Sequence, residues 1–204
     1  MTKHSTPRLL LVILGLLALA SAAQAQMDAG FIGKRYAGLG FFTENVRDSN
    51  MDNGNGVELF ANVPILDFLD AGFRASSERF SNFNYTDRRI GGYVTAYADL
   101  EWAKPFVEFS IGETNQSSTY NNVKYRNRES LWATSFGLEI PVTRSSALFA
   151  SAAYTEYFNS SYDSAWIYKF GLNTWFTPKL GAMIGASFYE SESITYSLGL
   201  NFRF

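Results

Sequence analysis

The sequence predicts an all-β fold: a closed antiparallel up-and-down transmembrane β-barrel of ten strands, with eight strands as the alternative, preceded by a cleaved signal peptide. Apolar and polar side chains alternate along many segments of about ten residues, as they do in strands with two different faces. Prolines recur every 36 to 41 residues after residue 25, and a short apolar run near the N-terminus indicates export. With 17% aromatic and 18% charged residues, the chain does not have the composition of a disordered protein.

Residues 1–25 have the three parts of a secretory signal peptide. Lys3 and Arg8 form a basic start, residues 9–20 form an apolar run, and Ala23 and Ala25 are the small residues of a cleavage site. The apolar run is shorter than the about 20 residues of a membrane-spanning helix, so cleavage is favoured over an N-terminal anchor. We therefore expect residues 26–204 to form one exported barrel domain.

The C-terminal segment shows the clearest strand pattern. Its polar side carries Thr195, Ser197, Gly199, Asn201 and Arg203. The apolar side carries Ile194, Tyr196, Leu198, Leu200, Phe202 and Phe204. Since successive side chains of a strand point to opposite faces, this segment has one apolar and one polar face. Residues 107–113, 131–140 and 166–176 show the same alternation.

Proline and clusters of polar residues divide the chain into hairpins. Proline lacks the N–H that a sheet ladder needs, so Pro64, Pro105, Pro141 and Pro178 each mark a tight turn. Polar loops are predicted at 48–56, 81–89, 116–127 and 159–164. The predicted strands are 31–46, 57–63, 69–80, 90–102, 106–115, 128–140, 147–158, 165–176, 179–190 and 194–204.

The two faces of the strands decide which kind of barrel this is. A soluble lipocalin-like barrel keeps its apolar side inside, whereas a membrane barrel turns it toward lipid. The apolar side here carries bulky aromatic and aliphatic residues, which would overfill the interior of a small barrel. The sequence therefore favours a barrel that spans a membrane. Because unpaired backbone groups are costly in hydrocarbon, the first strand must pair with the last.

The four tryptophans lie near the ends of predicted strands. Trp102 and Trp175 come beside proline turns, and Trp132 and Trp166 come beside polar loops. This placement is typical of the aromatic girdles at the two surfaces of a membrane. The predicted register turns Trp175 inward, so either the register slips there or the ring fills part of the lumen.

The end of the chain resembles the β-signal that the barrel-assembly machinery recognises in outer-membrane proteins of Gram-negative bacteria. The resemblance rests on Ser197, Gly199, Phe202 and the terminal Phe204. It implies that these residues are engaged during insertion. The rest of residues 26–204 is similar in layout to small outer-membrane barrels of the opacity-protein and outer-membrane-protein A/X kind, most of which have eight strands.

The sequence has few of the residues that catalysis or metal binding usually needs. The only histidine is His4, in the leader, and there is no cysteine, which excludes His-dependent nucleophiles and imidazole or thiolate metal sites. A pair of carboxylates for glycoside hydrolysis is the one arrangement left open. We therefore expect no enzyme, no cofactor and no metal. After residue 25 the chain has 15 basic and 19 acidic residues, so a nucleic-acid partner is not expected.

Several charged residues fall on the predicted inner face. They are Glu58, Asp70, Arg74, Glu78, Asp99, Glu101, Glu108, Glu139, Glu156, Lys169 and Arg203. The interior of a barrel of this size is about as wide as side chains can fill, which favours an ion-paired, hydrated plug. The alternative is a narrow cation-favouring channel. Acidic groups outnumber basic ones in this set, so in an ion-paired plug some carboxylates need a partner other than these basic residues.

The expected function follows from these features. We expect a monomeric outer-membrane barrel with a structural or surface-interaction role, in contact with outer-membrane lipid and lipopolysaccharide. A narrow channel for ions or small solutes and a soluble exported lipocalin-like ligand-binding barrel are the alternatives. The loop sequence from Tyr120 to Arg128 combines aromatic, amide and basic residues that suit glycans or the phosphates of lipopolysaccharide.

Overall fold

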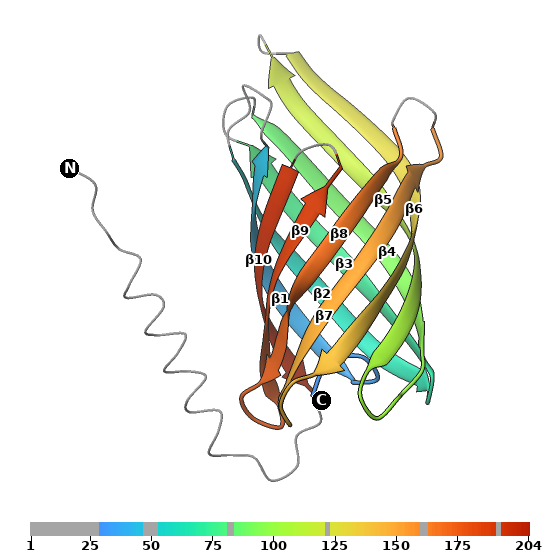
Figure 1. Cartoon of the computed structure of the whole chain (residues 1–204). Coiled ribbons are helices and arrows are strands. Elements are labelled where there is room, and N and C mark those ends of the chain that lie inside the picture. Colours follow the sequence, from blue (N-terminus) through green and yellow to red (C-terminus); the bar gives the residue numbers. More distant parts are fainter. Residues whose placement is uncertain (1–28, 47–52, 81–83, 121–122, 160–162, 191–192) are drawn as a thin grey trace, which may run out of the picture.

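The computed structural model describes residues 29–46, 53–80, 84–120, 123–159, 163–190 and 193–204. These residues form one closed antiparallel barrel of ten strands (Figure 1). The predicted signal peptide lies outside the described residues. The strands are β1 (Tyr36–Val46), β2 (Gly54–Leu66), β3 (Leu69–Phe80), β4 (Tyr85–Tyr97), β5 (Lys104–Tyr120), β6 (Val123–Pro141), β7 (Ser146–Tyr157), β8 (Ala165–Trp175), β9 (Leu180–Tyr189) and β10 (Ser193–Arg203).

Each strand pairs with its neighbours in the sequence, and β1 closes the ring by pairing with β10 from Tyr36↔Arg203 to Val46↔Ser193. Both the start of β1 and the end of β10 lie at one end of the barrel, which we call the terminal end. The opposite end, from which the β5–β6 hairpin projects, is the loop end (Figure 1). Closure leaves no unpaired sheet edge, as the membrane interior demands. Both the ten-strand count and the closure confirm the prediction.

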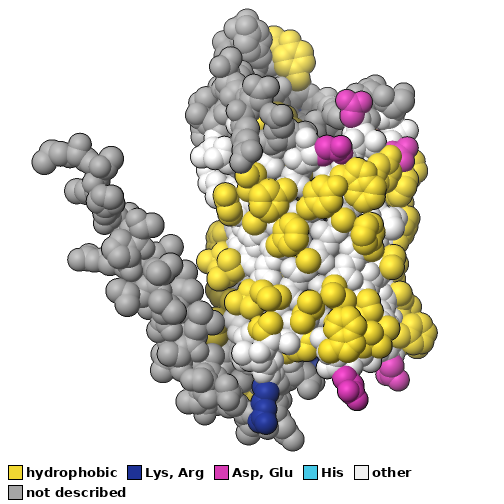
Figure 2. Space-filling view, viewed as in Figure 1, with side chains coloured by type: hydrophobic (Ala, Val, Ile, Leu, Met, Phe, Trp, Pro, Cys, Tyr) yellow, Lys and Arg dark blue, Asp and Glu magenta, His cyan; other side chains and the backbone are white. Residues whose placement is uncertain are grey.

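The apolar side chains face outward. Phe41, Leu198 and Ile184 are neighbours on β1, β10 and β9, and 43 to 50% of each is exposed. The residues between them along the strands, such as Ser197 and Gly185, face the interior and line its cavity. Apolar groups cover much of the outer surface of the barrel between its two ends (Figure 2). In water this surface would be costly, so the fold is that of a transmembrane barrel. No helix of the described residues is long and apolar enough to cross a membrane.

The barrel interior accommodates aromatic rings by pairing them with glycine. Phe60 lies opposite Gly38 on the neighbouring strand, and a Cβ at Gly38 would collide with the Phe60 ring. Tyr93 lies opposite Gly72 in the same way. Phe42, Phe106 and Phe149 repeat the arrangement opposite Gly56, Gly137 and Gly171. The inner glycines therefore make room for rings that the narrow lumen could not otherwise hold.

Several strand boundaries differ from the prediction. Residues 31–35, predicted as the start of a strand, instead form a turn with a Phe31–Lys34 backbone hydrogen bond. Strand β4 begins at Tyr85, inside the predicted 81–89 loop. Strands β5 and β6 continue through the predicted 116–127 loop as far as Tyr120 and Val123. Beyond the membrane both faces of a strand meet water, so polar residues can continue the ladder without apolar alternation.

Candidate functional site: the barrel lumen

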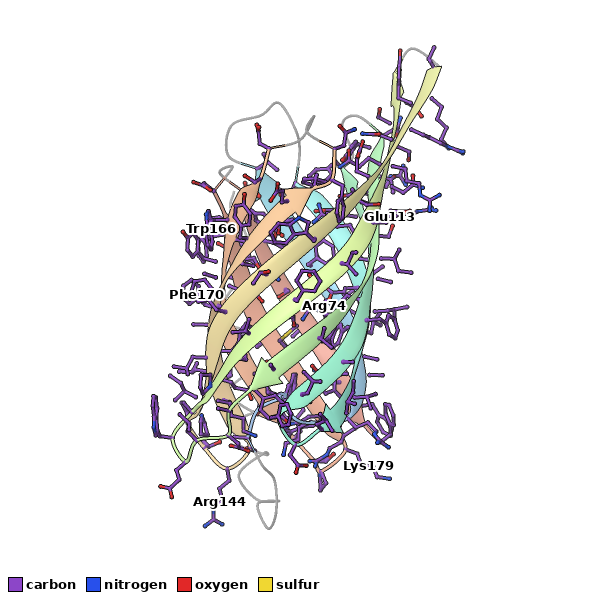
Figure 3. All side chains as sticks on the ribbon, turned by 90° about the vertical axis from the view of Figure 1, so that its right-hand side faces the viewer. Arg74, Glu113, Arg144, Trp166, Phe170 and Lys179 are labelled. Atoms are coloured by element: carbon purple, nitrogen blue, oxygen red, sulfur yellow. The ribbon has the colours of Figure 1, made fainter. Side chains whose placement is uncertain are left out.

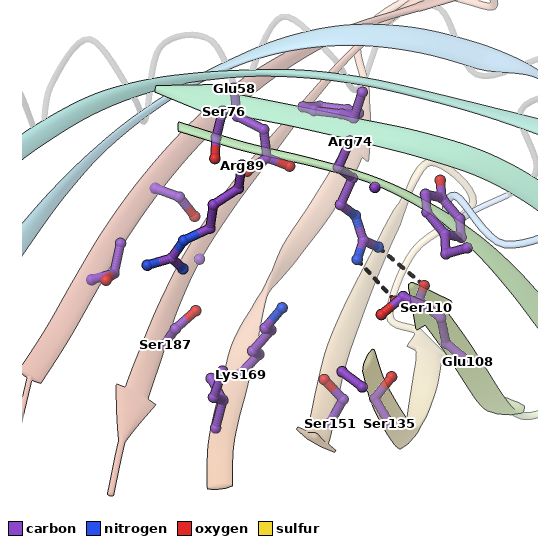
Figure 4. Close-up of a pocket in the computed structure, with 18 of the residues that line it drawn as sticks. Glu58, Arg74, Ser76, Arg89, Glu108, Ser110, Ser135, Ser151, Lys169 and Ser187 are labelled. Atoms are coloured by element: carbon purple, nitrogen blue, oxygen red, sulfur yellow. Dashed lines mark hydrogen bonds and ion pairs between the residues drawn. The ribbon is translucent and has the colours of Figure 1, made fainter. Parts of the chain in front are cut away.

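The interior holds a cavity of about 860 Å³ that extends from Phe31 near the terminal end to Glu190 near the loop end. Serine residues line its middle, among them Ser110, Ser135 and Ser151, together with the charged residues Arg74 and Lys169 (Figure 4). A lumen lined by hydroxyl and charged groups is suited to hold water rather than an apolar ligand.

The structure places seven of the predicted inner charges along this cavity, namely Glu58, Asp70, Arg74, Glu78, Glu108, Glu139 and Lys169. An eighth, Arg203, is half-buried opposite Tyr36 at the terminal end. Six charged residues along the cavity were missed, namely Glu44, Asp87, Arg89, Glu113, Asp163 and Glu190. Asp87 and Arg89 fall in a predicted loop, yet they continue the inward alternation of Gly91, Tyr93 and Thr95, which was the available signal.

Three predicted inner charges lie elsewhere, and for these the prediction is wrong. Asp99 and Glu101 are exposed in the β4–β5 turn because β4 already ends at Tyr97, and Asp99 pairs with Lys104 at 3.1 Å. Glu156 points outward, since its neighbours Thr155 and Tyr157 line the cavity. The small residues of β7, Ala-Ser-Ala-Ala, lack the apolar contrast that would have marked its faces.

An ion pair in the lumen joins Arg74 of β3 to Glu108 of β5. The two guanidinium nitrogens donate to the two carboxylate oxygens at 2.8 and 3.0 Å (Figure 4). Thr95 donates a third hydrogen bond to Glu108 at 3.2 Å, and the guanidinium lies 4.3 Å from the Tyr93 ring centre. This bidentate geometry is the strongest form of the arginine–carboxylate contact. Strands β3, β4 and β5 are therefore tied together inside as well as by their ladders.

Replacing Arg74 with alanine should lower the free energy of unfolding by about 1.5–3 kcal/mol, the range for hydrogen bonds to charged groups. Without Arg74, the Thr95 hydroxyl is the hydrogen-bond donor to Glu108 that remains among the described residues. Urea unfolding in lipid vesicles, followed by tryptophan fluorescence, measures the effect. Glu108→Gln should cost less, because an amide can still accept from Arg74. An equal loss for both variants would contradict the role given to the pair.

A second ion pair lies nearer the loop end. Arg89 contacts Asp87 at 2.7 Å, and Thr114 also donates a hydrogen bond to Asp87. Asp87 pairs across the ladder with Glu78, a buried side chain, and Glu44 lines the same cavity. In this part of the lumen Glu44, Glu78 and Asp87 lie beside Arg89, and Asp163 and Glu190 also line the cavity. It is the most acidic section of the cavity.

A turn of the chain before β1 covers the terminal end of the lumen. The backbone N–H of Phe31 donates to Glu139 at 2.9 Å, and that of Gly33 donates to Asp70 at 2.8 Å. Side-chain amides donate to the same carboxylates, Asn173 to Glu139 at 2.9 Å and Asn62 to Asp70 at 2.8 Å. Two of the predicted inner carboxylates, Asp70 and Glu139, are therefore bound by N–H donors rather than by cations. We call residues 29–35 the floor turn.

Glycine and tryptophan fix this turn in place. Gly30 has φ of +85°, a backbone conformation that favours glycine, and a Cβ there would collide with the Glu139 carboxylate. The indole N–H of Trp175 donates to the Gly30 carbonyl at 2.8 Å. The Trp175 ring, 1% exposed, meets Phe31 edge-on at a centroid distance of 4.9 Å and also packs against Tyr36. These rings form an apolar cluster at the terminal end of the lumen.

The floor turn separates two cavities. Glu139 lines both the main lumen and a smaller cavity of about 240 Å³ on the other side of the turn. Ala29, Lys34, Asp99 and Glu101 line the smaller cavity, at the mouth of the barrel. The floor turn and Glu139 thus lie between the main cavity and the smaller one.

The predicted aromatic girdle fits two of the four tryptophans on the outer wall. Trp132 contacts Phe109 and Tyr154 at centroid distances of 6.4 and 5.9 Å, and Trp166 contacts Tyr154 at 5.3 Å (Figure 3). Trp102 lies in the β4–β5 turn and is 65% exposed. The girdle role is wrong for Trp175, because the alternation of β8 carries its ring into the lumen with Asn173.

Comparisons with known proteins concern the fold. No protein-family model matches the chain, and no curated protein matches its sequence. Among solved structures, the translocator domain of the autotransporter NalP from Neisseria meningitidis is similar, with 10% identity, 95% of each chain covered and a TM-score of 0.50. Neisserial surface protein A has 12% identity over 83% of this chain and 96% of its own, with a TM-score of 0.46. The fold is that of an outer-membrane β-barrel.

Proposed function

We propose that the protein is an integral outer-membrane β-barrel with a structural or surface-interaction role and no catalytic activity. The floor turn carries this proposal, because its hydrogen bonds to Asp70 and Glu139 and its contact with Trp175 interrupt the lumen. A barrel that is blocked in this way is better suited to hold a fixed shape in the membrane than to pass solutes. In this account the projecting β5–β6 hairpin is the part that meets other molecules.

The export and insertion steps belong to the same proposal. Residues 1–25 direct secretion, and Ser197, Gly199, Phe202 and Phe204 are recognised by the barrel-assembly machinery. Phe202 and Phe204 are 52 and 63% exposed at the end of β10, so a partner can reach them. The inserted protein is a monomer surrounded by outer-membrane lipid and lipopolysaccharide.

Conductance of the purified protein in planar bilayers tests the structural role. The unmodified barrel should give no discrete current steps at moderate voltage, because the floor turn blocks the lumen. A shift between boiled and unboiled samples on a gel serves as the control that the barrel is folded. Regular unitary steps from folded protein would overturn the structural role in favour of a channel.

A channel is the second candidate, and the cavity is the observation that favours it. The cavity of about 860 Å³ is continuous from Phe31 to Glu190. Among the described segments, the floor turn is the one that blocks it at the terminal end. If that turn moved aside, the carboxylates near the loop end would favour cations.

A further inference from the structure

A cluster of basic side chains lies on the outer wall at the loop end of the barrel. Arg79 of β3, Arg88 of β4, and Lys124, Arg126 and Arg128 of β6 are all exposed. They belong to the outward-facing set, because they follow the exposed Phe73 and Ile90 and the outward Trp132 at intervals of two residues along their strands. We call these five residues the cationic face.

The strand register places the cationic face in rows that cross four strands. Arg79 is paired with Thr86, Thr86 with Ser117, and Ser117 with Arg126. In the adjacent row Arg88 is paired with Asn115, and Asn115 with Arg128. Neighbouring strands lie about 4.8 Å apart, so Arg88 and Arg128 project from backbones about 10 Å apart. Hydroxyl and amide side chains fill the positions between the basic ones.

The charge of this surface is strongly one-sided. The two rows hold no carboxylate among their described residues; in the next outward row Glu113 pairs with Arg128 at 2.6 Å, and one row further Glu156 lies beside Trp132. Within the described part of the chain, no ion pair joins Arg79, Arg88 or Arg126 to a carboxylate. At the terminal end the exposed charged residues are of both signs, with Arg144 and Lys179 (Figure 3) as well as Asp67, Asp99 and Glu101. Among the described residues, the two basic rows therefore lie at the loop end.

The cationic face borders the apolar wall directly. The next outward row toward the middle of the barrel holds Ile90 paired with Glu113, and the row after it holds Ile111 paired with Trp132. Trp132 in turn contacts Phe109. A molecule lying along this wall would meet an apolar and aromatic surface and then, about two residues further, several guanidinium groups. That order matches a lipid whose acyl chains end in an anionic headgroup.

We propose that the cationic face binds the phosphate groups of a phosphorylated glycolipid in the membrane leaflet at the loop end, the lipid A part of lipopolysaccharide. Guanidinium groups suit this role because they bind phosphate oxygens in pairs. The Ser117 and Thr86 hydroxyls between the arginines supply further hydrogen bonds. This inference rests on the proposed insertion into the outer membrane with the loop end outward, and it gives the surface-interaction role a specific ligand.

Lipid binding to the folded barrel tests this proposal. Native mass spectrometry of protein released from a neutral detergent counts the lipids retained, using lipid A with both phosphates and the same lipid without them. The unmodified protein should retain the phosphorylated form about tenfold better or more. The triple variant Arg79→Gln, Arg88→Gln, Arg126→Gln should lose that preference. Added salt should weaken it as well, because the contact is exposed.

A matched control separates position from total charge. The triple variant Lys104→Gln, Arg144→Gln, Lys179→Gln removes the same charge from the terminal end, where Figure 3 labels Arg144 and Lys179, and should keep the preference. Equal retention of both lipids by the unmodified protein would overturn the inference, and so would equal losses in the two triple variants. Competition by millimolar inorganic phosphate alone would assign the site to free phosphate and likewise overturn lipid binding.

The failure of this inference is distinguishable from that of the proposed function. Each sample is first checked for the gel shift between boiled and unboiled protein and for insertion into vesicles. Protein that stays in buffer without detergent would contradict the proposed membrane function itself. Protein that inserts but ignores the phosphates would leave the membrane function standing and refute the cationic face as a lipid site.

Discussion

Replacing Leu198 with arginine is expected to lower the free energy of unfolding of the membrane-inserted barrel by about 2–4 kcal/mol. Leu198 lies at the middle of β10, is 50% exposed, and has the outward Phe41 and Ile184 on either side. In a membrane its surroundings are acyl chains, where a guanidinium loses its hydration. Urea unfolding of the barrel in vesicles, followed by tryptophan fluorescence, measures the loss.

The neighbouring position provides the control. Ser197→Arg places the same charge one residue away, where it extends into a cavity lined by Glu58, Glu108 and other carboxylates. Its cost should be clearly smaller than that of Leu198→Arg, because the lumen is polar. A larger loss for Ser197→Arg would contradict the assignment of the two faces.

A variant that releases the floor turn is expected to conduct ions, whereas the unmodified barrel is expected to give no current steps. The double variant Asp70→Ala, Glu139→Ala removes the acceptors of the Phe31 and Gly33 N–H groups. Each buried N–H left without an acceptor costs about 1–3 kcal/mol, so the turn should leave its position. Planar-bilayer recordings should then show discrete current steps that the unmodified protein lacks. The steps should favour cations because Glu44, Glu78 and Asp87 remain in the lumen.

A control variant removes the same charge without touching the turn. The double variant Asp67→Ala, Glu101→Ala removes two exposed carboxylates at the terminal end and should still give no current steps. The gel shift between boiled and unboiled protein confirms that each variant is folded. A folded Asp70→Ala, Glu139→Ala barrel without current steps would mean that the floor turn does not control the lumen.

The alternation of side chains was sufficient to predict much of the fold. In β10 every second residue is apolar, and the structure places Leu198 and Leu200 outside and Ser197 and Asn201 inside. The pattern works because the two faces of a membrane strand have different solvents. Where both faces meet water, as from Ser117 to Tyr120 and from Val123 to Arg128, alternation carries no information. The extension of the β5–β6 hairpin was therefore missed.

The floor turn could not be predicted for a different reason. Phe31 and Ile32 read as an apolar strand start, and nothing local shows that their N–H groups bind Glu139, more than 100 residues away. The two glycines that flank them, with φ of +85° and +77°, were the available sign of a turn. The register did predict the inward Trp175, but not the Gly30 carbonyl that receives its N–H.

The distinction between an acyl-facing and a water-facing side of each strand can be measured directly in vesicles. The chain has no cysteine, so Leu198→Cys and Ser197→Cys each provide a unique site for a bimane fluorophore. Lipids with a spin label midway along the acyl chain quench a fluorophore that touches them. We predict strong quenching at position 198 and little at position 197. Equal quenching at the two positions, or stronger quenching at 197, would contradict the account.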